Sequence, residues 1–147
     1  MNLTETKIAL EKGSFDKSFK LLYGETENAK QRYSKAIDRF MDIYHGGENI
    51  RIFSAPGRTE IGGNHTDHQH GCVLAGSVDL DVIAIVSLNE DGKIRIKSEG
   101  YSMDTVDIAD LDKKDCEKGR AIALIKGVCA KFKEMGVELK GFDAYTT

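Results

Sequence analysis

The chain has 147 residues, 40% hydrophobic and 31% charged, and its 21 Lys+Arg against 24 Asp+Glu leave a formal net charge of -3. This composition is typical of one soluble globular domain; it excludes disordered, collagen-like and coiled-coil chains and leaves no basic excess for nucleic acid or an anionic membrane surface. The longest aliphatic run, 82–86, is far shorter than the roughly 20 residues of a membrane helix, and the polar N-terminal residues contain no signal-peptide core. Three widely spaced cysteines form no disulfide framework, so we expect a reducing, cytoplasmic location.

The first third of the chain is predicted to be helical. Between residues 29 and 44 apolar side chains recur at three-and-four spacing, which is typical of an amphipathic helix, and Gly46-Gly47 provides a stop. A weaker helical pattern precedes it at residues 15–22. We therefore expect residues 1–48 to form a helical leader.

After residue 49 the apolar period becomes that of strands. A short strand at 50–54 is predicted to end at Ala55-Pro56-Gly57 and to lead into a loop. A β-branched strand at 78–88, a turn at 89–92 and an alternating strand at 93–97 predict an antiparallel hairpin. The remaining elements are a strand near 105–108, a helix at 116–135 and a last strand within 137–147 that stops without a partner. We therefore expect one incomplete α+β unit, cut in mid-element.

The segment Ser54 to Gly71, SAPGRTEIGGNHTDHQHG, is the most polar and glycine-rich part of the chain. Its glycines adopt positive φ easily and leave room for a ligand against the backbone. The side chains of Arg58, Asn64, His65 and Asp67 offer donors and acceptors for several hydroxyl groups at once. The mixture favours recognition of a sugar-like polyol.

Three other uses of this segment compete with sugar recognition. His65, Asp67, His68 and His70 carry metal-binding groups, although the spacing His-x-x-His-x-His matches no zinc signature. The glycines suit a phosphate, but the Lys-Ser/Thr that completes the usual phosphate loop is absent. The third alternative is a glycine-rich turn whose polar side chains only cap the backbone, which is the interpretation we favour for His68 and His70.

The same residues resemble a known family. Without gaps, GRTEIGGNHTDHQHG at 57–71 is similar to the galactokinase signature Gly-Arg-Val-Asn-Leu-Ile-Gly-Glu-His-Thr-Asp-Tyr-Asn-x-Gly, in which the arginine, histidine, aspartate and glycines stand at the same offsets. Ile125-Lys126-Gly127-Val128 resembles the family's later Val-Lys-Gly-Val segment, so the resemblance spans roughly residues 20–147. It implies the N-terminal domain of a GHMP small-molecule kinase, an α+β, two-layer architecture in which a mixed sheet packs against helices, with residues 49–147 as the sugar-binding part.

The resemblance also implies roles for individual residues. The matching arginine of galactokinases lies beside the anomeric hydroxyl of the sugar, so Arg58 is the candidate catalytic residue and also binds substrate. The matching histidine and aspartate contact sugar hydroxyls, a role that falls to His65 and Asp67. Asn64 is a further candidate substrate contact, and it stands where the family has glutamate.

Other departures concern the nucleotide. The family often has Trp-Ala-Asn-Tyr in its adenine pocket where this chain has Ala121-Ile-Ala-Leu124, so the cofactor-binding residues stay unassigned. The family's phosphate loop, Pro-x-Gly-x-Gly-Leu-Ser-Ser-Ser-Ala, and the catalytic aspartate beyond it do not occur in these residues. Helix-end amides and Mg²⁺ neutralise a transferring phosphoryl group, so we expect the chain to be inactive by itself.

Taken together, the resemblance implies an ATP- and Mg²⁺-dependent galactokinase that phosphorylates the anomeric hydroxyl of galactose, of which this chain is the N-terminal sugar-binding segment. The alternative is a non-catalytic galactokinase-like sugar sensor or regulator. A metal-dependent enzyme built on the histidine cluster is a third hypothesis. We expect galactose or a close relative as the ligand, no metal site, no nucleic-acid or membrane partner, and self-association through the unpaired edge of the last strand.

Overall fold

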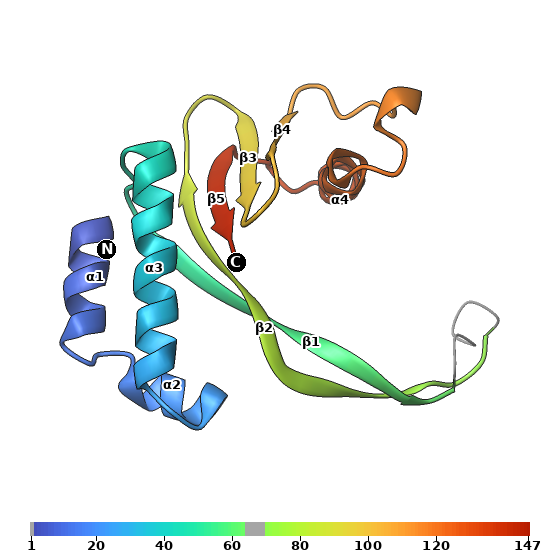
Figure 1. Cartoon of the computed structure of the whole chain (residues 1–147). Helices are drawn as coiled ribbons and strands as arrows, with labels where there is room; N and C mark the ends of the chain where they lie inside the picture. The colour runs from blue at the N-terminus through green and yellow to red at the C-terminus, as the bar shows by residue number, and fades with distance from the viewer. Residues whose placement is uncertain (1, 64–69) are drawn as a thin grey trace.

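The computed structural model describes residues 2–63 and 70–147. The N-terminal part folds into helices α1 (Leu3–Glu11), α2 (Asp16–Tyr23) and α3 (Glu27–Tyr44), and Figure 1 shows α1 lying beside α3. The helices predicted at 29–44 and 15–22 are confirmed in α3 and α2. Helix α1, for which no separate helix was predicted, begins with a capping box between Asn2 and Glu5. No helix in the described ranges is long and apolar enough to cross a bilayer.

The described strands form one mixed sheet in the order β1-β2-β5-β3-β4. Neighbours are antiparallel except for β5 and β3, which run parallel. The strands are β1 (Arg51–Gly62), β2 (Leu74–Leu88), β3 (Lys93–Ser98), β4 (Met103–Asp107) and β5 (Phe142–Thr146). The predicted mixed α+β architecture, a sheet packed against helices, is confirmed.

The predicted hairpin between the strands at 78–88 and 93–97 is wrong, because β5 lies between them. Ala144 of β5 stands opposite Val86 on one side and Ile96 on the other. The last strand therefore has partners on both sides, and the expectation of an unpaired edge there is also wrong. The physical reason lies in β5 itself: Tyr145 packs into one core and Phe142 against the other, and a strand with apolar groups on both faces is stable in the middle of a sheet.

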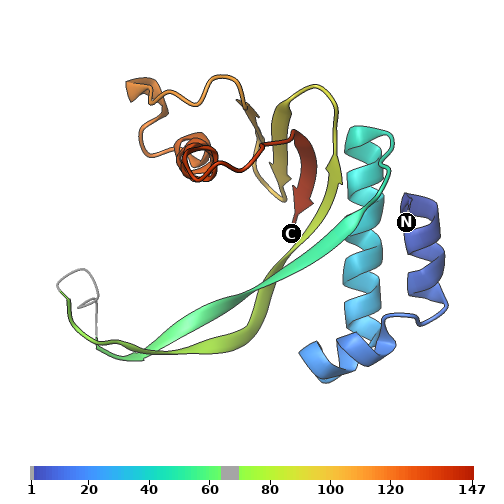
Figure 2. The same cartoon turned by 180° about the vertical axis from the view of Figure 1, so that it is seen from behind.

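Helices cover the two faces of the sheet unequally, as the two views in Figures 1 and 2 show. Helices α1 to α3 pack on one face, where Phe40 and Ile37 of α3 are fully buried against Ile83 and Ile85 of β2. On the opposite face α4 (Ala121–Glu134) packs over β3 and β4 in a second, smaller core. The helix predicted at 116–135 thus begins later than expected, because residues 115–117 form a separate short 3-10 turn.

Strands β1 and β2 continue past the other strands as a two-stranded ribbon. We call residues 56–62 and 74–81 the arm; Figure 1 shows it projecting away from the helices and from α4. The prediction that the first strand ends at Ala55-Pro56-Gly57 is wrong. Strand β1 is an edge strand, and a proline on an edge strand removes no ladder hydrogen bond when its nitrogen faces the free side. The pairing with β2 resumes after a register shift between Pro56 and Arg58.

Candidate functional site

The candidate catalytic residue, Arg58, lies on the arm. It belongs to β1, stands opposite Ser77 of β2, and is exposed. Its position on a paired strand, rather than in a loop, orients its backbone through the ladder. Asn64, His65 and Asp67, the other three candidate residues, lie outside the described residues, as does His68.

The residue just beyond the β1 end of the arm requires glycine. The backbone of Gly63 has a φ of 107°, a conformation that residues with a side chain rarely adopt. A Cβ atom at this position would lie 2.6 Å from the carbonyl oxygen of Cys72 and 2.7 Å from the Cα of Val73. The two strands of the arm therefore approach closely just before the segment that carries the candidate sugar-reading side chains.

The described residues do not assemble a metal site. Within residues 2–63 and 70–147 no group of three or more His, Cys, Asp or Glu side chains is placed to hold an ion. His70, one of the metal candidates, is exposed and has a φ of 60° in a turn. The other residues of the histidine cluster lie in the segment outside the description, so the metal hypothesis gains no support from the fold.

A buried carboxylate lies at the root of the arm. Asp81 of β2 stands opposite Pro56, and only 6% of its side chain is exposed. Tyr23 donates to its Oδ2 at 2.6 Å and Ser54 donates to the same oxygen at 2.5 Å. Arg32 forms an ion pair with Oδ1 and donates a second hydrogen bond to the Asp81 carbonyl oxygen at 2.7 Å. One carboxylate thereby connects α2, α3, β1 and β2.

The electrostatics of this cluster keep the carboxylate charged. Burial by itself raises the pKa of Asp81, but the hydrogen bonds from Ser54, Tyr23 and Arg32 outweigh burial and leave its pKa below the ordinary value. Burial, followed by the hydrogen bond to Asp81, raises the pKa of Tyr23 and keeps the phenol protonated as a donor. The hydroxyl groups of Tyr23 and Tyr33 are hydrogen-bonded to each other at 2.7 Å. Because the pKa of Asp81 is lowered by folding, its stabilising contribution is present above about pH 4 and is lost as the pH falls through the lowered value.

This cluster of Asp81 and its partners was not predicted from the sequence, although the strand pattern contained one signal of it. Asp81 lies on the same face of β2 as Ile83 and Ile85, which are both fully buried. A charged residue in register with a buried apolar face needs partners. The sequence could have indicated this need, but not which side chains meet it.

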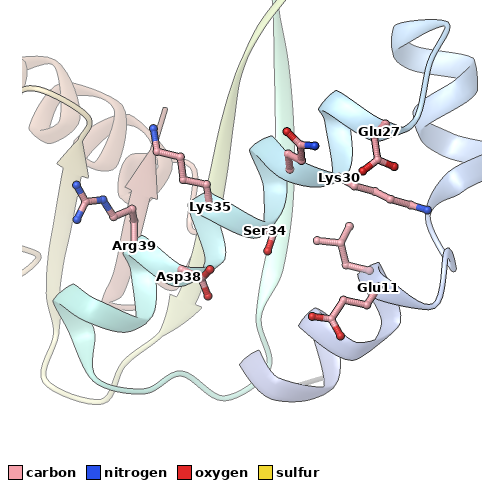
Figure 3. Close-up of a pocket in the computed structure, with 9 residues that line it drawn as sticks. Glu11, Glu27, Lys30, Ser34, Lys35, Asp38 and Arg39 are labelled. Carbon is pink, nitrogen blue, oxygen red and sulfur yellow. The ribbon is translucent and has the colours of Figure 1, made fainter.

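A cavity lies elsewhere, between α1 and α3. It has a volume of about 600 Å³, and Figure 3 shows that Glu11 comes from α1 and the other labelled side chains from α3. Two of its lysines are in ion pairs, Lys30 with Asp16 at 2.8 Å and Lys35 with Glu99 at 3.2 Å. None of the candidate sugar-binding residues lines it. We therefore do not assign the substrate site to this cavity.

The segment that resembles Val-Lys-Gly-Val has a structural role in this fold. Lys126 of α4 is buried, and its Nζ lies 3.0 Å from Oε1 of Glu117 and 3.4 Å from the carbonyl oxygen of Asp112. These contacts join α4 to the preceding loop. Leu124, which stands at the last position of the family's adenine-pocket segment, is 75% exposed.

Comparisons with known proteins point to one family. A family model described as the galactokinase galactose-binding signature matches residues 38–88. The galactokinase of Lactococcus lactis is 29% identical over 112 residues, which are 75% of this chain and 28% of that protein. The galactokinase of Streptomyces coelicolor is 32% identical over 108 residues, 74% of this chain and 28% of that protein. The chain thus spans just over a quarter of the length of these relatives.

Solved structures agree with this result. The crystal structure of Lactococcus lactis galactokinase complexed with galactose superposes with a TM-score of 0.65 at 27% identity, covering 74% of this chain and 29% of that one. Mevalonate kinase from Methanococcus jannaschii, at 11% identity and a TM-score of 0.51, shares the fold over 66% of this chain. The resemblance to the N-terminal part of galactokinases, inferred from the residues at 57–71, is confirmed.

Proposed function

We propose that this chain is the galactose-binding region of a galactokinase-type phosphotransferase. The observation that carries the proposal is the galactose-binding signature at residues 38–88, which includes Arg58 and the segment from Asn64 to Asp67. The match to a galactokinase structure that contains galactose supports it. In the proposed reaction the anomeric hydroxyl oxygen of galactose attacks the γ-phosphorus of ATP, the bond from that phosphorus to the bridging oxygen breaks, ADP leaves, and the hydroxyl proton is released.

In this proposal each candidate residue of the motif makes a different contact with the sugar. The guanidinium of Arg58 stays protonated and offers several fixed donors, which suits stabilisation of negative charge at the acceptor oxygen. Asp67 accepts hydrogen bonds from ring hydroxyls, and His65 makes further hydrogen bonds to the ring. A carboxylate that accepts two such bonds distinguishes sugars that differ at one carbon. Asn64 would make a weaker contact than the family's glutamate, because an amide oxygen is neutral.

ATP and Mg²⁺ are not assigned to residues of this chain. Within the described ranges no cluster of ion-binding side chains exists, and the family's glycine- and serine-rich phosphate loop is not found in the 147 residues. We propose that both bind to other parts of a full-length protein. By itself this chain is then expected to bind sugar without turnover.

Titration of the chain with D-galactose tests the sugar site. Arg58→Ala and Asp67→Ala should each weaken binding about 10- to 100-fold, since a hydrogen bond to a charged group contributes about 1.5–3 kcal/mol. Arg51→Ala is the matched control, because Arg51 is an exposed arginine on the same strand but outside the motif at residues 57–71. D-Glucose should bind more weakly than D-galactose. If both site variants bind galactose as the Arg51→Ala control does, the assignment of the site is wrong.

The second candidate function is a non-catalytic galactose sensor. It is favoured by Asn64 in place of glutamate and by Ala121 and Leu124 in place of the aromatic residues associated with adenine. The two functions differ in one measurement on the full-length protein. Galactose-dependent release of ADP supports the kinase, whereas galactose binding without ADP release supports the sensor.

A further inference from the structure

The arm makes few contacts with the rest of the described molecule. From Pro56 to Gly62 all β1 side chains are exposed. The pairing of β2 with β5 extends from Leu88 only as far as Ala84, with further backbone bonds between Ile83 and Thr147. Beyond these residues the two strands of the arm pair with each other. The direction of the arm is therefore set mainly at its root, where Ser54 and Asp81 leave the sheet.

At this root both oxygens of the Asp81 carboxylate are engaged. Arg32 of α3 occupies Oδ1, while Tyr23 of α2 and Ser54 of β1 occupy Oδ2. The second Arg32 hydrogen bond, to the Asp81 carbonyl oxygen, holds the backbone of β2 at the same point. These hydrogen bonds come from groups in two helices and a strand, and because they are directional they resist rotation of the arm about its strand axis. Apolar contacts are not directional and would allow such a rotation.

The length of the arm amplifies small movements at its root. Gly62 lies six residues beyond Pro56, and at about 3.3 Å per residue the strand extends about 20 Å from the root to the tip. A rotation of about 5° at the root would then displace the tip by about 2 Å. Misplacing a bound group by about 1 Å costs a reaction about 100-fold in rate.

We propose that Asp81 is a positioning residue: through Arg32, Tyr23 and Ser54 it holds the arm, and with it Arg58, in one orientation relative to the helices. This inference rests on the proposed function for the identity of what is positioned. Asp81 itself need not touch the sugar. Replacing Asp81 keeps Arg58 on the arm but loosens the orientation in which the arm holds it.

The distance between the arm and the body provides a direct test. Cys72 near the arm tip and Cys116 near α4 are both exposed and accept spin labels, whereas Cys129 is buried. In the chain without sugar, Asp81→Asn should at least double the width of the distance distribution between the two labels. Asp143→Asn is the matched control, since Asp143 of β5 forms an ion pair with Arg95 of β3 at 3.0 Å, away from the arm. The distance distribution of this control should be as wide as that of the wild type.

The result decides the inference whatever the chain binds. Unchanged width in Asp81→Asn overturns it, and so does equal broadening in Asp143→Asn. If Asp81→Asn does not fold, Tyr23→Phe, which keeps the ring and removes one donor to Asp81, is judged by the same criterion. A wild-type chain that does not bind galactose would refute the proposed function but not the positioning of the arm.

Kinetics of a full-length galactokinase form of the protein separate positioning from a purely structural role. Asp81→Asn should lower kcat at least 10-fold and leave KM for galactose within about 3-fold, because Arg58 stays on the arm and every side chain of the motif at 57–71 is kept. A loss of stability alone would lower the amount of folded enzyme but would leave kcat, calculated per folded molecule, unchanged. Unchanged kcat in Asp81→Asn would overturn the proposal.

Discussion

Lys126 offers a stability prediction whose size follows from its surroundings. Its side chain is 7% exposed, that of its partner Glu117 is 14% exposed, and their Nζ and Oε1 atoms lie 3.0 Å apart. Replacing Lys126 by Met keeps most of the aliphatic volume and removes the charge. Glu117 would then remain as a buried carboxylate without its cation.

The expected cost is about 3 kcal/mol. Removing one partner of a buried ion pair typically costs about 3–5 kcal/mol, because the remaining charge is desolvated and unpaired. Glu117 ends a short 3-10 turn next to a loop, so it can move toward water, which places the cost at the lower limit. For a chain of this size 1 kcal/mol corresponds to about 2–4 °C, so the melting temperature should fall by about 6–12 °C.

Urea unfolding followed by circular dichroism measures this cost. Lys131→Met is the control on the same helix, because Lys131 pairs with Glu134 at a similar 2.9 Å while their side chains are 65% and 69% exposed. Exposed pairs of this kind contribute at most about 0.5 kcal/mol. The double variant Lys126→Met/Glu117→Gln should recover much of the loss. If Lys126→Met costs no more than Lys131→Met, the burial argument is refuted.

Two further predictions concern the frame of the fold. Burial, followed by the charge of Asp143, raises the pKa of Tyr44 to about 12, so the stabilisation that its neutral phenol contributes is complete below about pH 10 and is lost as the pH rises toward 12. Urea unfolding at pH 9, 10 and 11 should therefore show a shallower decline for Tyr44→Phe than for the wild type, and parallel declines would contradict the assignment. Gly141→Ala should destabilise by about 1–3 kcal/mol, because its Cβ would overlap Oδ1 of Asn89 and lie 2.7 Å from the backbone nitrogen of Lys93. Gly127→Ala, where no atom lies within 4 Å of the added carbon, should instead be neutral or stabilising, and equal stability of the two variants would show that β5 does not enter the sheet as described.

The helices were predictable because their signal is local. The three-and-four spacing at 29–44 reports which side of α3 is apolar, and the buried residues of α3 lie on that side: Ala29, Tyr33, Ala36, Ile37 and Phe40. Strand pairing is different, since any two apolar strands joined by a short turn resemble a hairpin. The insertion of β5 between β2 and β3 depends on residues about 50 positions later in the chain, and local pattern carries no information on that distance.

The polar segment illustrates the same division. Pro56 and Gly57 predict the end of a strand from their local preferences, yet β1 continues because it is an edge strand with a single partner. Of the four candidate site residues, the described structure contains only Arg58, on the arm; the roles of all four remain predictions from the motif.

By itself the sequence determined the class of fold, the helices of the first third, the approximate location of the strands and the motif that resembles the galactokinase signature, because periodicity, turn residues and motif spacing are properties of neighbours along the chain. Only the tertiary structure decided the strand order, the projecting arm and the partners of Asp81. Those features arise when side chains far apart in sequence compete for the same buried positions. Asp81 shows the difference most clearly: its need for partners is visible in the strand pattern, but Arg32 and Tyr23 meet that need only after α2 and α3 pack on the sheet.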